Sequence, residues 1–477
     1  MKTSKKLLAL LLVLVMTMSI TACGKKKDTP TDAEVTAAPT EAAQTTEEVV
    51  EPTEAPTAEE VVVRHEGAEP RTIKVGTWWD VFYDSRHTAA DDNPSVANYE
   101  EAEMQLANIR AIEEKYNVKL EFVNLTWDGI KESINTSIMA GTPDCDVYTS
   151  DLQFGIPAVA ADLALPLEDF VPAEDDIFND QTIFKSLNLF GAEKNYLFAG
   201  NGIEQGAVGL CYNATMIDEL GLESPQDLYD RGEWTWDKFK EYLIASTKDN
   251  DGDGTTDVYG YGSIWPYTLA QLAMSNGGSI AATETEGLSS KPIVETLEFF
   301  YDGYNTSKTF RPWNADDWGD NLNAWKDGKV AFWGTQNWVQ SGAEVEFDMS
   351  IVPWPIGPSG NVDTNSTFTA AGNWYFVPKG VEDPYLVYKV MYDWTNWFDN
   401  DLSYRDNTEW AESCFDTTRD FDYIVEMGKK FTVDPWNGIG FDAGTPMIQI
   451  MNGEATVSQA VEANKQLLQD ALDLIYK

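Results

Sequence analysis

The feature that most constrains the fold is an alternation of strand and helix patterns that begins just after residue 70. A short β run at 73–76 is followed by a helical pattern at 99–116, in which apolar residues recur at spacings of two to four. An apolar strand at 118–123, a second helix at 127–139 and a strand at 145–151 continue the series. Alternating strands and helices build α/β proteins with doubly wound sheets, so we predict that fold class.

The same fold class predicts where a ligand would bind. In doubly wound sheets, ligands lie beyond the carboxyl ends of the strands. The residues that follow the first and third strands are therefore expected at the rim of a site: Trp78, Trp79, Asp80, Thr149, Ser150 and Asp151. About 400 residues follow position 70, which exceeds the size at which one core keeps growing, so we expect two domains.

The first residues are typical of an export signal. Lys2, Lys5 and Lys6 precede an apolar stretch at 7–18, and the small residues Thr21 and Ala22 follow. The stretch is shorter than the roughly 20 residues that a membrane-spanning helix needs. From 25 to about 70 the chain is rich in Thr, Ala, Glu and Pro and has no aromatic residue. Such a segment cannot bury enough apolar surface to fold, so we expect a disordered acidic linker or a glycosylated spacer.

Composition excludes several classes of function. The chain has 33 Lys and Arg against 79 Asp and Glu, a formal net charge of −46, which argues against nucleic acid and disfavours anionic substrates. Only two histidines, His65 and His87, are present, so an HExxH zinc site is excluded and histidine-based catalysis is not expected. Cys145, Cys211 and Cys414 lack CxxC spacing and fit either one disulfide or three buried thiols. The 17 tryptophans suggest that some indoles line a binding surface.

Several motifs resemble those of one family in their order along the chain. "ITAC" followed by Gly24 resembles the lipobox of bacterial lipoproteins, in which Cys23 becomes the lipidated first residue and two acyl chains, such as palmitate, anchor it. "AGTPDCDVY", "LCYNATMIDELGL", "DNDGDGTTDVYGYG", "AWKDGKVAFWGTQNW", "IVPWPIGPSG" and "VSQAVEANKQLLQDAL" resemble motifs of the carbohydrate-type extracellular solute-binding proteins of ABC importers. The resemblance covers almost all of the chain after the linker.

This resemblance implies a two-lobed architecture like that of maltose-binding proteins. Each lobe would be a doubly wound α/β sheet, discontinuous in sequence, with crossovers near 199–206, 353–358 and 400–410. The implied organisation is a signal peptide at 1–22, a lipid-anchored linker at 23–70, an N-terminal lobe from 71–201 plus 355–405, and a C-terminal lobe from 202–354 plus 406–477.

The resemblance also implies a sugar ligand, and the chemistry of sugars selects candidate residues. An indole covers the apolar face of a sugar ring, and a carboxylate accepts hydrogen bonds from its hydroxyl groups. Any one of these tryptophans could equally be a core residue, and Trp234, Trp236, Trp394 and Trp397 are expected in the core. The candidates for ligand binding are Trp78, Trp79, Asp80, Asp151, Glu204, Gln205, Trp265, Trp333, Trp338, Asn373, Trp374 and Trp436.

An Asp- and Gly-rich loop at 249–260 has part of a calcium-binding pattern. Asp249, Asp251 and Asp253 occupy positions 1, 3 and 5 of such a loop, and Asp257 occupies position 9. Position 12 is Gly260, where the bidentate Glu should be. We expect either a structural calcium ion held by Asp249, Asp251, Asp253, Thr255 and Asp257 or a plain turn.

The expected function is that of a monomeric substrate-binding lipoprotein on the outer face of the cell membrane. It would capture a sugar between the lobes and deliver it to the permease subunits of an ABC transporter, without catalytic residues or a catalytic cofactor. One alternative is a cell-surface glycoside hydrolase, which needs two facing carboxylates. A sugar-sensing receptor or adhesin is another. Nucleic acid is not an expected partner.

Overall fold

The computed structural model describes residues 69–475 except 81–82, 95, 97, 190–191, 205–206, 264–266, 315–318, 337–344, 364, 369–372, 409–410, 412–414 and 416. The signal segment, Cys23 and the acidic linker lie outside the described residues, as do Gln205, Trp265, Trp338 and Cys414. Within the described part of the chain, no helix is both long and apolar enough to cross a membrane.

The first sheet has six strands in the order β2-β1-β3-β11-β5-β4. β1 pairs in parallel with β2 and β3, whereas β11 is antiparallel to β3 and β5, and β4 is antiparallel to β5. The alternating strands and helices at the beginning of the folded part therefore form the expected doubly wound sheet. The strands are β1 (Arg71–Thr77), β2 (Val118–Asn124), β3 (Val147–Ser150), β4 (Phe184–Leu187), β5 (Leu197–Gly200) and β11 (Trp374–Phe376).

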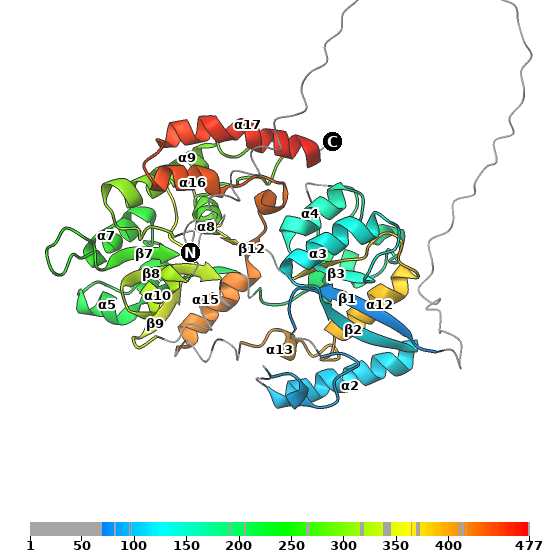
Figure 1. Cartoon of the computed structure of the whole chain (residues 1–477). Coiled ribbons are helices and arrows are strands. Elements are labelled where there is room, and N and C mark those ends of the chain that lie inside the picture. The colour runs from blue at the N-terminus through cyan, green and yellow to red at the C-terminus, as the bar shows by residue number, and fades with distance from the viewer. Residues whose placement is uncertain are drawn as a thin grey trace, which may run out of the picture. The chain divides into compact units, whose positions relative to one another are not determined.

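Helices cover both faces of the first sheet, because successive side chains in a strand point to opposite sides. Tyr375 packs in one core cluster, whereas Trp374 and Phe376 pack in another. On the Tyr375 face lie α2 (Tyr99–Tyr116) and α12 (Pro384–Thr395). On the Trp374 face lie α3 (Trp127–Ser133), the π-helical turn η2 (Ile134–Ile138) and α4 (Leu152–Ala160). Figure 1 shows α2 on one side of β1 and β2 and α3 and α4 on the other.

The second sheet has four strands in the order β7-β8-β6-β9. β6 is antiparallel to β8 and β9, and β7 is parallel to β8. The strands are β6 (Val208–Asn213), β7 (Tyr259–Ser263), β8 (Val330–Gln336) and β9 (Met349–Val352). The helices of this part are α5 (Ala214–Glu219), α6 (Pro225–Asp230), α7 (Trp236–Ser246), α8 (Tyr267–Ser275), α9 (Lys291–Tyr301), α10 (Asp320–Lys326), α15 (Thr418–Lys429), α16 (Gly444–Met451) and α17 (Val457–Ile475).

The chain passes from the first sheet to the second between β5 and β6, and returns between β9 and β11. Near these passages, β10 (Thr367–Phe368) pairs in parallel with β12 (Phe431–Thr432). The prediction of an α/β fold with two sheets is thus confirmed. The remaining short elements are η1 (Ala90–Asp92), η3 (Leu167–Asp169), η4 (Asp176–Phe178), η5 (Asp302–Thr306), η6 (Pro435–Gly438) and α13 (Leu402–Arg405).

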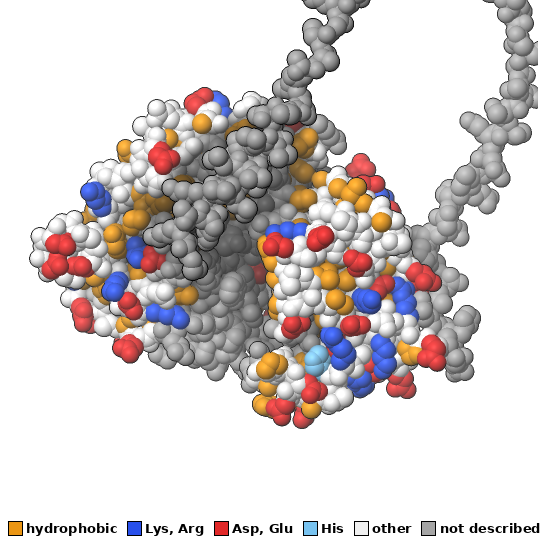
Figure 2. Space-filling view, viewed as in Figure 1, with side chains coloured by type: hydrophobic (Ala, Val, Ile, Leu, Met, Phe, Trp, Pro, Cys, Tyr) orange, Lys and Arg blue, Asp and Glu red, His pale blue; other side chains and the backbone are white. Residues whose placement is uncertain are grey.

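Charges of both signs are interspersed on the surface. On the face drawn in Figure 2, Lys and Arg side chains alternate with Asp and Glu over the described residues, and none of these residues form a broad basic area there. Phosphate backbones bind to continuous basic surfaces. The described residues on this face form no continuous basic surface of that kind.

Candidate functional site

One edge of the first sheet brings together the residues that the strand-end rule singles out. Because β1, β2 and β3 are parallel, their last residues lie along the same edge. β11 begins at that edge, because its first residue, Trp374, pairs with Ser150, the last residue of β3. β4 begins there too, because its first residue, Phe184, pairs with Gly200, the last residue of β5. We call this the carboxyl edge.

Three indoles form the rim of the carboxyl edge on the α3 and α4 face. The ring centroids of Trp78 and Trp79 are 4.5 Å apart, and those of Trp78 and Trp127 are 5.3 Å apart. Trp78 and Trp127 also contact the ring of Phe154 on α4 edge-on. All three residues are half-buried. This group, Trp78, Trp79 and Trp127, is called the tryptophan rim below.

Hydrogen bonds hold the backbone of the rim in place. The hydroxyl of Thr77, the last residue of β1, donates to the carbonyl oxygen of Trp79 at 2.8 Å and so fixes the turn after the strand. Thr126 caps α3 by accepting from the backbone N–H of Gly129 at 3.3 Å, which places Trp127 at the first helical position. Ordered backbone at both positions means that the indoles are held before any ligand arrives.

Two carboxylates accompany the rim and differ in their surroundings. Asp80 is exposed and accepts a hydrogen bond from the side-chain amide of Asn124 at 2.7 Å. Asp151 is only 8% exposed and caps α4, accepting from the backbone N–H of Gln153 at 2.8 Å. Burial raises the pKa of Asp151 to about 6, more than the hydrogen bond from Gln153 lowers it. Asp80 is therefore an accessible acceptor, whereas Asp151 is a buried one whose ionised form is disfavoured.

Residues from the C-terminal part of the chain reach the α4 side of the rim. η6 approaches α4 so closely that a Cβ on Gly438 would lie 2.3 Å from the carbonyl oxygen of Leu152. Trp436, which is 2% exposed, belongs to the same core cluster as Phe154, and Trp78 and Trp127 pack against that cluster. Trp436 and the tryptophan rim are thus brought together around α4.

The position of Trp436 depends on a buried carboxylate just before it. Asp434 accepts from the backbone N–H of Ala281 at 3.0 Å and from the hydroxyl of Ser279 at 3.0 Å, and also from the N–H groups of Ile280 and Trp436. Burial raises the pKa of Asp434 above its ordinary value. These bonds tie the start of η6 to the segment after α8.

Other predicted ligand residues lie elsewhere. Trp333 is 0% exposed, stacks nearly parallel on Trp325 with centroids 6.3 Å apart, and packs in a separate cluster with Ile424, so it lies in the interior of the second part. Trp374 is also buried, at 2% exposure, with the Lys185 ammonium 5.7 Å from its ring centroid. We therefore leave Trp333 and Trp374 out of the site that we propose. Glu204 and Asn373 line a cavity.

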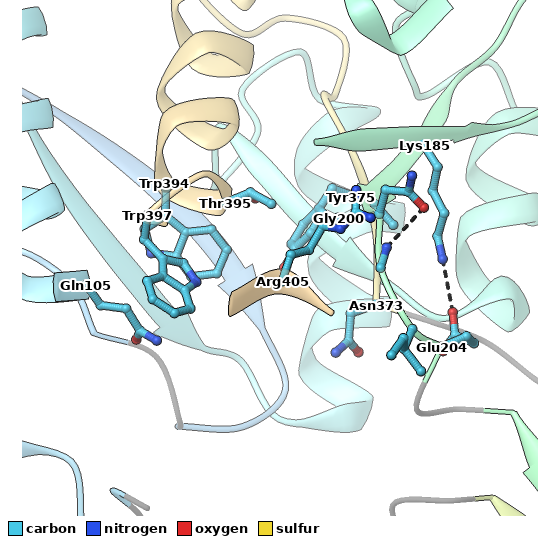
Figure 3. A pocket seen from close by; sticks show the side chains of 14 residues that line it. Gln105, Lys185, Gly200, Glu204, Asn373, Tyr375, Trp394, Thr395, Trp397 and Arg405 are labelled. Carbon is cyan, nitrogen blue, oxygen red and sulfur yellow. Dashed lines mark hydrogen bonds and ion pairs between the residues drawn. The ribbon is translucent and has the colours of Figure 1, made fainter. Parts of the chain in front are cut away.

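This cavity, of about 510 Å³, lies at the β11, β5 and β4 end of the carboxyl edge. Its walls include Tyr375, Trp394 and Trp397, together with Gln105 of α2 (Figure 3). Glu204 forms an ion pair with Lys185 at 3.1 Å, and both side chains are largely buried. We call this cavity the α2–α12 groove.

The Asp-rich loop gathers three of its carboxylates. Oxygen atoms of Asp249, Asp251 and Asp257 lie within 4.8 Å of one another, whereas Asp253 is not in this group and accepts from the backbone N–H of Thr255. Backbone N–H groups, that of Gly254 foremost, lower the pKa of Asp249. The loop joins α7 to β7, where acidic side chains gather in Figure 2.

Sequence reasoning did not select Trp127 or the tryptophans of the groove. Trp127 comes just after β2, and the strand-end rule that selected Trp78 would have found it. Trp394 and Trp397 were expected in the core, but they are half-buried and line the groove, while Trp234 and Trp236 are buried as expected. Trp397 lies two residues beyond the end of α12, and this position outside the helix could have indicated that Trp397 is not a core residue.

The raised pKa of Asp151 predicts a specific pH dependence of stability. The unfolded chain ionises this group near pH ~3.9, whereas the folded chain does so near 6. Between these values the unfolded state binds fewer protons, so this group makes the free energy of unfolding fall as pH rises. We expect Asp151→Asn, which keeps the helix cap, to gain up to roughly 3 kcal/mol over wild type between pH 4 and pH 7. Urea unfolding across this range measures the gain. A difference in the free energy of unfolding between Asp151→Asn and wild type that does not change with pH would contradict the raised pKa of Asp151.

Comparison with solved structures identifies the fold. An ABC substrate-binding protein of Listeria monocytogenes in complex with cycloalternan is 16% identical, with a TM-score of 0.56 over 85% of this chain and 99% of that one. The maltose/maltodextrin-binding domain of Bdellovibrio bacteriovorus bound to maltotriose is 14% identical, with a TM-score of 0.53 over 84% and 98%. UgpB from Mycobacterium tuberculosis in complex with glycerophosphocholine is 14% identical, with a TM-score of 0.56 over 85% and 99%.

Comparison by sequence identifies the family. A search of curated proteins found no match. Residues 94–391, more than half of the 477 residues, match the family described as bacterial extracellular solute-binding protein. That family consists of binding proteins that work outside the cytoplasm, and the solved structures share its two-sheet α/β fold. The chain belongs to the family of bacterial extracellular solute-binding proteins.

Proposed function

We propose that this protein is the substrate-binding lipoprotein of an ABC importer for a sugar or oligosaccharide. The observation that carries the proposal is the tryptophan rim, three half-buried indoles beside the exposed carboxylate of Asp80. Indoles provide a rigid apolar surface for the C–H face of a sugar ring, and a carboxylate accepts hydrogen bonds from its hydroxyl groups. The ligand class follows from this combination.

The similar structures support an uncharged ligand more than a charged one. Two of those described above hold cycloalternan and maltotriose, whereas UgpB holds glycerophosphocholine, which carries a phosphate. A phosphate ligand calls for unpaired cations or free N–H groups. Two described cations lie near the rim, and both already have partners. Lys131 lies 4.6 Å from the ring centroid of Trp127 and pairs with Asp128 at 3.6 Å, whereas Arg86, which interacts electrostatically with Asp80, pairs with Asp84 at 2.6 Å. A neutral, hydroxyl-rich solute suits this neighbourhood better.

Capture is proposed to work by closure of two lobes around the sugar. The rim belongs to the first sheet, whereas η6, which packs beside it on α4 and holds the buried Trp436, comes from the C-terminal part of the chain. A ligand that contacts both favours the conformation in which they are close, by its higher affinity for that state. The closed form then docks on the membrane permease and releases the sugar unchanged. In the alternative of an anchored glycoside hydrolase, two carboxylates would flank the bond that is cleaved.

Replacing one indole of the rim tests the proposed site. We expect Trp79→Ala to weaken the binding of a matching sugar at least tenfold, about 1.4 kcal/mol, because the rim loses its stacking surface. Isothermal titration calorimetry with a glycan panel measures the affinity. The matched control is Trp313→Ala, at a half-buried indole of the second part. Equal affinity in Trp79→Ala and wild type would refute the site, and recovery of cleaved sugar would refute the binding-protein function.

The lipid anchor at Cys23 has its own test. We expect Cys23→Ser to abolish acylation and to move the protein from the membrane fraction to the medium or the soluble extract, because two acyl chains supply the stable attachment. Immunoblots of fractionated cells and metabolic labelling with a fatty acid measure this. A variant that stays in the membrane and still incorporates label would contradict the anchor.

The calcium ion at the Asp-rich loop stays a prediction. Carboxylates as close as those of Asp249, Asp251 and Asp257 repel one another unless a cation neutralises them. If calcium binds only the folded form, adding it after chelation raises the melting temperature, and Asp249→Asn removes the shift. Glu462→Gln, at an exposed acid of α17, should keep the shift. Identical melting curves with chelator and with millimolar calcium would show that the loop is a plain turn that binds no calcium.

A further inference from the structure

A second cavity, of about 820 Å³, lies at one end of the second sheet. Four segments line it: the start of α5, the loop from α7 to β7, the turn from α10 to β8, and the residues just before β9. These segments meet where β6 ends and β7, β8 and β9 begin, because β6 is antiparallel to β8 and β9 and β7 is parallel to β8. We call this cavity the α5–α10 groove.

The α5–α10 groove is remote from the passages between the two sheets. The chain enters β6 at Val208 and leaves β9 at Val352, whereas Asn213, at the other end of β6, lines the groove. β6 has six residues at ~3.3 Å each, so its ends lie roughly 16 Å apart. The groove also shares no lining residue with the α2–α12 groove and none with the tryptophan rim. A molecule bound here would therefore be a different molecule from the transported sugar.

Backbone hydrogen bonds hold the walls of the groove in place. The N–H of Ala214 donates to the carbonyl oxygen of Asp348 at 2.8 Å, which joins the start of α5 to the segment before β9. The N–H of Lys248 donates to the carbonyl oxygen of Val258 at 2.9 Å, which closes the loop between α7 and β7 at its base. The groove therefore has ordered walls before any ligand arrives.

One buried polar group of the groove has an unused hydrogen-bond donor. Asn213 is only 4% exposed and caps α5, since its Oδ1 accepts from the backbone N–H of Met216 at 2.8 Å. Its Nδ2 makes no hydrogen bond within the described part of the chain, and a Cβ on Gly328, which also lines the groove, would lie 4.0 Å from it. Buried polar groups are nearly always paired, so this amide points to a ligand or an ordered water that accepts from it.

Charged side chains line the groove without pairing with one another. Lys248 and Lys326 make no ion pair with any residue that the structure describes. Glu219 and Glu346 are likewise unpaired among the described residues. Lys329, in contrast, is already neutralised by a neighbouring aspartate at 2.9 Å. The groove thus offers two positive and two negative groups to a ligand.

The lining also has an apolar part. Met216, Val258 and Phe347 line the groove and are half-buried. Phe347 is held by edge-on packing against Trp325, with ring centroids 4.9 Å apart. An apolar part beside charges of both signs suits a ligand that carries both charges and has apolar groups between them.

We propose that the α5–α10 groove is a binding site for a short peptide, which it recognises by the charges at the two ends. The ammonium groups of Lys248 and Lys326 and the amide of Asn213 bind the C-terminal carboxylate. The carboxylates of Glu219 and Glu346 bind the N-terminal ammonium group.

The size and the charge balance of the groove both favour this ligand class. A volume of about 820 Å³ is within the range of small-molecule sites. A ligand with charge of one sign only would face two groups of like charge, and a zwitterionic peptide avoids that repulsion. This site does not depend on the proposed transport function.

Capped peptides test whether the two ends are recognised. Isothermal titration calorimetry on the full-length protein, in detergent and with a chelator, uses trialanine and tripeptides with leucine or phenylalanine at the centre. Each peptide is used with free ends, N-acetylated and C-amidated. We expect saturable binding, at up to millimolar concentration, of at least one peptide with free ends. Either cap should weaken that binding roughly fivefold or more, because it removes a partly exposed ion pair.

Variants without the charges assign the two ends to the groove. Lys248→Met combined with Lys326→Met should weaken binding of the free peptide roughly fivefold or more and leave the C-amidated peptide unchanged. Glu219→Gln combined with Glu346→Gln should weaken the free peptide likewise and leave the N-acetylated peptide unchanged. Lys308→Met, at an exposed lysine of the second part, is the matched control and should bind as wild type. Melting temperatures confirm that each variant folds.

Three outcomes would overturn the peptide site. One is the absence of saturable binding for every peptide of the set. Equal affinities for free and capped peptides are another. The third is wild-type affinity for the free peptide in either double variant. None of these outcomes bears on sugar binding at the tryptophan rim, and loss of sugar binding in Trp79→Ala would leave the peptide site standing.

Discussion

Parallel pairing of β1 with β2 and β3 is the constraint on which the rest of this structure depends. It sends three strand ends to one edge, and the antiparallel strands β11 and β4 add their first residues there. Backbone hydrogen bonds of the sheet thus decide where side chains can gather, before any ligand chemistry is considered. The tryptophan rim and the α2–α12 groove both lie along this edge.

Tryptophan has two roles in this chain, and local sequence separates them only partly. Trp79 and Trp127 are next to strand ends, where a side chain can remain half-buried, whereas Trp333 lies inside β8 and stacks on Trp325 in the core. A tryptophan in the interior of a paired strand points into one of the two layers that cover the sheet. Position relative to the end of a strand therefore separates the half-buried indoles Trp79 and Trp127 from the core indole Trp333.

Much of the fold was predictable because it depends on short-range patterns. The spacing of apolar residues located α2 and β2 to within a residue, and the alternation of elements predicted the doubly wound sheet. Contacts between distant segments were not predictable. Nothing in the sequence around Gly438 shows that it must pack against Leu152, and nothing near Gln105 shows that it lines the same cavity as Trp397. Each pair joins residues almost 300 positions apart, and both help to shape the carboxyl edge.

The central claim is that the carboxyl edge binds an uncharged sugar on the tryptophan rim. A crystal structure of the wild-type protein grown with a sugar that it binds tests this most directly. We expect electron density for a sugar ring stacked on the indole of Trp79, with a hydroxyl group within hydrogen-bond distance of Asp80. Density for the sugar confined to the second sheet and its helices, with the indoles of the rim untouched, would contradict it.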